Sequence, residues 1–178
     1  TEVWSLPLRH RIPTSGYLFR QKEPALNVKK YAIERYALTV PQIVQAKRGE
    51  DIVLESGEVL ANADITYRPY GALSYAYCSD TNYSARLAKM VEGVDMLYHE
   101  ATYAADMRKT AKERGHATTA DAAKVAQMAG AGRLLIGHFS SRYKDLEVLL
   151  AESREIFPAT DIARERETFI IEPKATKL

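Results

Sequence analysis

Apolar and polar positions alternate along the first part of the chain in a way that predicts β-hairpins. Residues 2–8 alternate apolar and polar side chains, and residues 15–21 have the composition of a partner strand. Further on, Ser56-Gly57 stands between two short apolar runs, which is typical of a second hairpin. The chain is therefore expected to begin with β structure.

Helical spacing interrupts this pattern twice. In residues 25–38 the apolar residues recur at helical intervals, and Asn27 is the expected N-cap. Residues 39–50 predict another short helix, in which the first turn tolerates Pro41 and Gly49 ends the helix.

From residue 72 onward, short apolar runs alternate with amphipathic segments, which predicts strands alternating with helices. The expected strands cover residues 72–80, 94–101 and 133–139; the expected helices cover 82–93, 106–115, 119–131 and 145–157. Thr118 or Thr119 is the expected cap of the third helix, and a strand pair in 160–164 and 167–173 is expected to close the chain. This alternation predicts an α/β protein with a mixed or parallel sheet flanked by helices.

The composition is that of a globular protein, with 46% hydrophobic and 27% charged residues in a chain of 178. We expect no membrane span, since no run of eighteen apolar residues occurs, and no secretion signal at the start. The single cysteine, Cys78, cannot form an internal disulfide, which fits a cytoplasmic protein. A net charge of +2 neither requires nor excludes a nucleic-acid partner.

Candidate chemistry gathers where three expected strands end. Asp80, Glu100 with its neighbour His99, and His138 each follow an apolar run. The carboxyl ends of strands in an open α/β sheet face the ligand crevice, so these side chains are expected to meet there. Imidazole and carboxylate groups are ligands for metal ions such as zinc, and His10 is a further candidate ligand.

His116 stands apart from this group because it precedes the start of an expected helix. Helix N-termini favour anions, and an imidazole there is suited to act as a general acid on a phosphate. The alternative is a histidine in an exposed capping turn.

Five ordered segments resemble one known family. LRHRIPTSGY, YCSDT, YHEAT, GHATTADAA and HFSSRY are similar, in order and spacing, to the C-terminal half of ribonuclease Z. That family comprises tRNA 3′-processing endonucleases of the metallo-β-lactamase superfamily. The resemblance implies that residues 1–178 form the second half of an αββα sandwich, with a mixed sheet flanked by helices. It also implies a cytoplasmic enzyme, a precursor tRNA substrate and a homodimer.

The resemblance implies a role for each site residue. His10, Asp80 and His138 match ligands of a two-zinc site, with Asp80 bridging the ions; His116 and Glu100 match the catalytic pair, and His99 is left with a supporting or structural role. Residues suited to RNA contact are Ser140, Ser141 and Arg142, and Lys29, Lys30, Lys47 and Arg48 within a tRNA-binding arm at 20–60. A solvated basic surface is the alternative for the arm.

The chain departs from the family pattern in three places. Ala117 stands where the family's His-Ser-Thr loop has serine, and Val40-Pro41-Gln42 stands where the arm often carries Gly-Pro. The His-x-His-x-Asp-His motif of the family's first half is absent. The chain alone is therefore expected to be inactive, to bind zinc weakly and to form oligomers. Two alternatives remain open: a non-catalytic binding domain, and a related hydrolase such as an arylsulfatase-type esterase.

Overall fold

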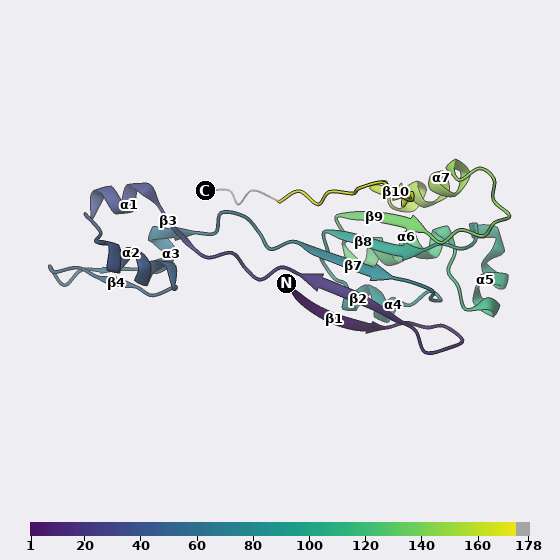
Figure 1. The fold of residues 1–178 in the computed structure, drawn as a ribbon, viewed down its shortest axis with the longest axis horizontal. Coiled ribbons are helices and arrows are strands. Elements are labelled where there is room, and N and C mark those ends of the chain that lie inside the picture. Colours follow the sequence, from purple (N-terminus) through teal and green to yellow (C-terminus); the bar gives the residue numbers. More distant parts are fainter. Residues whose placement is uncertain (174–178) are drawn as a thin grey trace. The chain divides into compact units, whose positions relative to one another are not determined.

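The computed structural model describes residues 1–173 and divides into two compact units. The first contains residues 1–21 and 73–171; the second contains residues 22–72 with 172–173. Figure 1 labels the elements of both units.

A six-stranded mixed sheet forms the centre of the first unit, in the order β1-β2-β7-β8-β9-β10. β1, β2 and β7 pair antiparallel with one another in this order, and β7, β8, β9 and β10 pair in parallel. The strands are β1 (Glu2–Pro7), β2 (Ser15–Arg20), β7 (Ser74–Cys78), β8 (Met96–Glu100), β9 (Arg133–Gly137) and β10 (Thr160–Ile162). The parallel strands bring the polar segments that follow β7, β8 and β9 to one edge of the sheet.

Helices cover one face of this sheet. They are α4 (Ala85–Met90), α6 (Thr119–Ala129) and α7 (Glu147–Ile156). Ser84 caps α4 by accepting a hydrogen bond from Leu87 N, and Thr118 forms a capping box with Asp121 at the start of α6. These caps satisfy amide groups that the first helical turn leaves unpaired.

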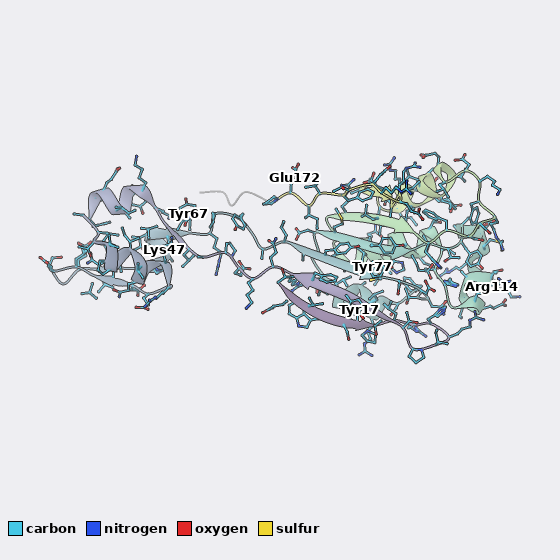
Figure 2. The ribbon with its side chains drawn as sticks, viewed as in Figure 1. Tyr17, Lys47, Tyr67, Tyr77, Arg114 and Glu172 are labelled. Carbon is cyan, nitrogen blue, oxygen red and sulfur yellow. The ribbon has the colours of Figure 1, made fainter. Side chains whose placement is uncertain are left out.

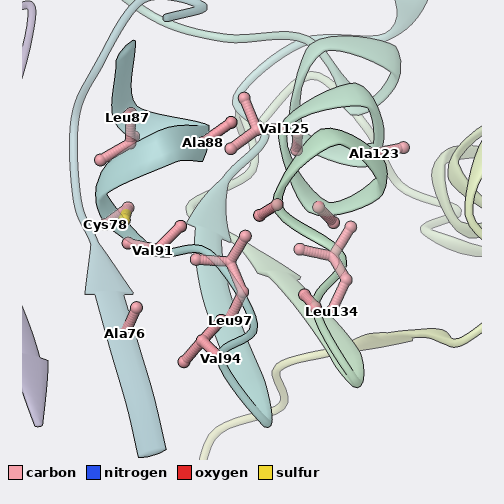
Figure 3. Close-up of a cluster of buried hydrophobic side chains, with 14 of the residues drawn as sticks. Ala76, Cys78, Leu87, Ala88, Val91, Val94, Leu97, Ala123, Val125 and Leu134 are labelled. Carbon is pink, nitrogen blue, oxygen red and sulfur yellow. The ribbon is translucent and has the colours of Figure 1, made fainter. Parts of the chain in front are cut away.

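The main core lies between the strands and helices α4 and α6. Figure 3 shows Ala76 and Cys78 of β7, Leu97 of β8 and Leu134 of β9 packed against the helices, where Val125 of α6 also lies. Burial raises the pKa of the Cys78 thiol to about 12, so this group stays neutral and packs as an apolar side chain.

The opposite face of the sheet carries aromatic rings. Tyr17 of β2 and Tyr77 of β7 are direct cross-strand partners, and Figure 2 labels both. Tyr77 stacks on Tyr98 of β8 with ring centroids 4.8 Å apart, and Phe19 stacks on Tyr75 at 6.0 Å. Such pairs stabilise strand pairing and fix its register.

Short helices and hairpins make up the second unit. Its elements are β3 (Asn27–Val28), α1 (Lys30–Arg35), α2 (Val40–Lys47), β4 (Ile52–Val53), β5 (Val59–Leu60), α3 (Asn62–Ile65) and β6 (Thr66–Tyr67). A small core with Ala46, Ile52 and Ile65 holds them together. Figure 2 labels Lys47 and Tyr67 in this unit.

Most expected elements are present, including both hairpins, the alternation after residue 72 and the mixed sheet flanked by helices. The helix expected from Asn27 is wrong in its start, because Asn27–Val28 pairs with β6 and α1 begins at Lys30. The expected closing strand pair is also wrong: Thr160–Ile162 pairs in parallel with β9, and residues 167–173 form no strand. In the stretch 1–173, no helix is long and apolar enough to cross a membrane.

Leu97 offers a test of the core, because its side chain is fully buried. Leu97→Ala should lower the free energy of unfolding by about 2–5 kcal/mol, through lost apolar burial and the cavity left behind. Urea unfolding would measure this change. The matched control is Val148→Ala on the exposed side of α7, where the change should stay within about 0.5 kcal/mol. Equal losses in both variants would contradict this account of the core.

Candidate metal and catalytic site

Three loops meet at the carboxyl edge of the parallel strands, and register explains why. Cys78 pairs with His99 across β7 and β8, and Glu100 pairs with Gly137 across β8 and β9. Asp80 comes two residues after Cys78 and His138 directly follows Gly137, so both leave the sheet beside Glu100. Figure 1 shows α5 (Arg108–Arg114), preceded by a 3₁₀ turn at Ala105–Met107, beyond the same strand ends.

The Glu100 carboxylate connects these loops and is fully buried. Its Oε1 accepts hydrogen bonds from Thr81 N (3.0 Å), His116 Nδ1 (2.9 Å) and Ala117 N (3.1 Å). Its Oε2 accepts from Thr102 N (2.9 Å) and Thr102 Oγ1 (2.8 Å). Hydrogen-bond donors from three separate segments thus offset the desolvation penalty of this buried carboxylate. The same bonds hold the three segments together.

The Thr102 hydroxyl extends this network to His138. Its oxygen lies 2.9 Å from His138 Nδ1 and 3.3 Å from His116 Nδ1. Because the hydroxyl hydrogen is directed to Glu100, the hydroxyl oxygen is the acceptor for His138 Nδ1–H. A single side chain therefore contacts the carboxylate and two histidines.

These contacts assign the same tautomer to three histidines. His10 Nδ1 lies 2.8 Å from the carbonyl oxygen of Gly115, which can only accept, so Nδ1 carries the hydrogen. His116 Nδ1 donates to Glu100 and His138 Nδ1 donates to Thr102. In each ring the hydrogen bond leaves Nε2 free for a ligand or a proton, as is usual for metal-binding histidines.

The backbone of Gly115 lies directly against the His10 ring. It has φ +85°, and a Cβ added there would lie 2.7 Å from His10 Nδ1. A side chain at this position would therefore displace the His10 ring and strain the end of α5.

The geometry partly fits a metal site. Potential ligand atoms of His10, Asp80 and His116 lie within 4.8 Å of one another, and so do those of Glu100, His116 and His138. Asp80 Oδ1 also lies 3.6 Å from His138 Nδ1. Glu100 is poorly suited to ligation because both of its oxygens are engaged, whereas Asp80 is half-buried and close to both His10 and His138.

His138 has an unusual backbone conformation. Its φ is +60°, in the left-handed region that non-glycine residues rarely occupy. This turn ends β9 and precedes Ser140, whose N–H donates to the carbonyl of Thr102 at 3.0 Å. Backbone strain of this kind is common where a functional side chain must be aimed.

His99 lies away from this cluster, in the core beneath helix α6. Its Nδ1 donates to the Glu100 carbonyl at 2.6 Å, and Nε2 has no hydrogen-bond partner among residues 1–173. Burial lowers the pKa of His99 below its usual value, so the ring is neutral and structural.

The expected RNA-contact residues fall in two places. Ser140, Ser141 and Arg142 follow β9; the Arg142 guanidinium lies 5.2 Å from the centre of the Tyr103 ring, and its Nε donates to Ser140 Oγ at 3.3 Å. The other four expected RNA-contact residues lie in the second unit. Lys29 Nζ donates to the Asp64 carbonyl and Lys30 pairs with Glu34, while Lys47 and Arg48 lie at the end of α2.

Two contributors were missed by sequence reasoning. Thr81 and Thr102 are ordinary residues by type, but their positions directly after Asp80 and two residues after Glu100 place them against the buried carboxylate. A small hydroxyl residue just past a strand that ends in an acid was the available signal.

Comparisons with known proteins show what the chain as a whole resembles. The chain is 42% identical over 165 residues to ribonuclease Z of Porphyromonas gingivalis, covering 93% of this chain and 54% of that protein. It is 39% identical over 171 residues to ribonuclease Z of Cytophaga hutchinsonii, covering 96% of this chain and 54% of that protein. The expected resemblance to ribonuclease Z is confirmed. The chain spans about half the length of the curated ribonuclease Z relatives it matches.

Solved structures give the fold. The metallo-β-lactamase fold protein YhfI of Bacillus subtilis matches with a TM-score of 0.57 at 17% identity, covering 91% of this chain and 46% of that one. Human tRNase Z, short form, matches with a TM-score of 0.51 at 21% identity, covering 96% and 43%. No protein-family profile matches the chain. The α/β fold expected from the sequence, about half of a metallo-β-lactamase fold, is thus confirmed.

The buried His99 predicts how stability depends on pH. Its pKa is lowered in the folded state, so the unfolded chain binds the extra proton first as pH falls. His99 should therefore contribute full stability above its unfolded pKa of about 6.5 and lose it below, by up to about 1.4 kcal/mol per pH unit.

Urea unfolding of the wild type and of His99→Gln between pH 5 and 7.5 would test this. The variant should show the shallower fall in stability on acidification, whatever its stability at pH 7.5. Parallel pH profiles would show that His99 does not titrate as expected.

Proposed function

We propose that the protein carrying this chain is an endoribonuclease that removes the 3′ trailer of precursor tRNA and leaves a 3′-hydroxyl. The observation that carries the proposal is the buried Glu100 carboxylate bonded to His116, beside the potential ligand atoms of His10 and Asp80. The name shared by the relatives supports the substrate. A cytoplasmic homodimer is part of the same proposal.

In this proposal His10, Asp80 and His138 would hold zinc, and Asp80 would supply the carboxylate among these ligands. The donor set is suitable, because zinc accepts imidazole nitrogen and carboxylate oxygen. Three ligands are too few to hold two ions tightly, so further ligands from outside this chain belong to the proposal. When bound, such ions lower the pKa of a water and stabilise charge on the phosphate.

His116 is assigned to the leaving group. Glu100 fixes its Nδ1–H, so the Nε2 nitrogen is the one that can carry a proton to the reaction. As an oxygen from water bonds to phosphorus, the bond between phosphorus and the 3′-oxygen breaks, and the 3′-oxygen takes the electron pair of that bond and accepts this proton. Glu100 stabilises the imidazolium before the transfer and keeps the ring oriented afterwards.

RNA contact is assigned to two groups of residues. Ser140, Ser141 and Arg142 line the approach beside His138, where hydroxyl and guanidinium groups suit a phosphate backbone. Residues 20–60, with their lysines and Arg48, form the proposed tRNA-binding arm; the compact unit that contains most of them spans residues 22–72. Phosphate neutralisation by such side chains makes binding salt-dependent.

The decisive experiment is cleavage of a precursor tRNA with a defined 3′ trailer, using the protein as encoded. Product ends would be mapped, and release of a tRNA with a 3′-hydroxyl at the trailer junction is expected. Tight tRNA binding with no cleavage at any zinc concentration would favour the binding-domain alternative. Hydrolysis of an aryl ester with no action on RNA would favour the esterase alternative.

His116 and Asp80 should separate by metal content. His116→Ala should slow cleavage by about 10²–10⁴-fold while zinc content is unchanged, because His116 supplies a proton and is not a ligand. Asp80→Ala should lose both zinc and activity. Metal analysis and single-turnover kinetics would measure both. Loss of zinc from His116→Ala would make it a ligand, which the nearness of His10, Asp80 and His116 permits.

A better leaving group refines this prediction. A substrate whose leaving oxygen has a low pKa needs no proton, so the defect of His116→Ala should shrink on it. An equal defect on both substrates would contradict the general-acid role.

Thr102 should act on metal affinity through His138. Thr102→Val removes the acceptor for His138 Nδ1–H and should weaken zinc binding by roughly 10–100-fold. Thr102→Ser keeps the hydroxyl and should restore affinity. Competitive zinc titration measures the effect, with thermal melting of the metal-free protein as the control for folding. An equal loss of zinc affinity in both variants would mean that Thr102 contributes only packing.

A further inference from the structure

A cavity of about 290 Å³ adjoins His116 on the side of α5 and α6. Its walls come from four separate segments: Arg9 after β1, Asn82 and Tyr83 after β7, Arg108 and Lys112 on α5, and Asp121 in the first turn of α6. His116 completes the lining. Its volume is near the lower end for ligand cavities, about 300–1,000 Å³, which suits one small group and not a long segment.

Positive charge dominates this cavity. Three permanent cations, Arg9, Arg108 and Lys112, face a single carboxylate, Asp121. Asp121 Oδ1 lies 3.7 Å from Arg108 Nε and so offsets that one guanidinium. Neither Arg9 nor Lys112 forms an ion pair with any residue in the described part of the chain. The cavity therefore has two uncompensated cations, which favour an anionic ligand.

Hydrogen bonds hold the backbone of the cavity wall at Arg9 and Asn82. Arg9 N donates to Thr81 Oγ1 at 3.0 Å, and Asn82 N donates to the Arg9 carbonyl at 2.7 Å. Thr81 N in turn donates to Glu100 at 3.0 Å. The backbone at Arg9 is thus connected through Thr81 to the same carboxylate that orients His116, so this wall of the cavity and the proposed acid are positioned by one residue.

We propose that this cavity binds the phosphodiester immediately 5′ of the scissile phosphate, through Arg9 and Lys112. The inference rests on the proposed function, in which His116 protonates the 3′-oxygen of the nucleotide at the cleavage point. After the scissile phosphate itself, that nucleotide's own 5′-phosphate is the next anion on the leaving-group side, which is the side on which His116 acts and on which the cavity opens beside it. Arg108, held by Asp121, flanks the same phosphate. Recognition here is of charge and position, and it is independent of base identity.

Single neutral linkages test the assignment. A short RNA spanning the trailer junction would carry a methylphosphonate at the linkage 5′ of the scissile one, or at the linkage 3′ of it. Fluorescence anisotropy would measure binding without requiring cleavage. The 5′ substitution should weaken binding to the wild type by roughly tenfold or more, as expected for loss of charge-assisted hydrogen bonds, whereas the 3′ substitution should have little effect.

Variants of the protein test whether Arg9 and Lys112 are the residues that sense the charge of the 5′ linkage. Arg9→Ala/Lys112→Ala should bind the unmodified RNA more weakly, show a salt slope smaller by about 1, and no longer distinguish it from the 5′ methylphosphonate. The matched control, Lys89→Ala on α4, removes a positive charge outside the cavity and should keep the wild-type sensitivity. Persistent discrimination by the double variant, or stronger sensitivity at the 3′ linkage, would overturn the proposal.

The two hypotheses fail separately. If the wild type binds with the expected sensitivity to the 5′ linkage but releases no trailer, the subsite stands and the endonuclease function fails. If the wild type cleaves correctly and the double variant cleaves and binds as well as Lys89→Ala, the function stands and the subsite fails.

Discussion

The candidate site depends on burying one carboxylate with all of its donors in place. Glu100 is fully buried and accepts five hydrogen bonds, from Thr81, Thr102, His116 and Ala117. Leaving such a group unpaired would cost several kcal/mol, by the usual penalties for buried charge. The loops after β7 and β8 and the loop before α6 are therefore constrained to meet at this point.

Sheet geometry makes that meeting possible. β7, β8 and β9 are parallel neighbours, so three consecutive strand ends deliver their polar residues to one edge. The candidate metal ligand His138 and the candidate acid His116 are then positioned by the same two residues, Thr102 and Glu100. Thr102 contacts Glu100 on one side and His138 on the other, so the orientation of a candidate metal ligand and that of a candidate acid depend on the same few atoms.

Much of the fold could be predicted from the sequence, because period-two and helical spacing are local signals. The strand ends carrying Asp80, Glu100 and His138 were predicted for the same reason. Two misses show the limit. Asn27 has the residue type of a helix cap, but pairing with Tyr67 of β6 decides its conformation. The partner of Thr160–Ile162 is β9, which lies more than twenty residues away. The contact between Thr102 and His138 and the cavity beside His116 were out of reach, since each depends on segments that only the folded sheet brings together.

The second unit enters the chain between two strands that are direct neighbours. β2 and β7 pair antiparallel, and where the chain leaves the sheet, Gln21 N donates to the Leu73 carbonyl at 2.8 Å. The chain thus departs and returns at one point, as it would through an ordinary hairpin turn. Long insertions at such a point cost little extra loop-closure entropy. Residues 22–72 can consequently be lengthened, shortened or exchanged without changing the strand register that builds the candidate site.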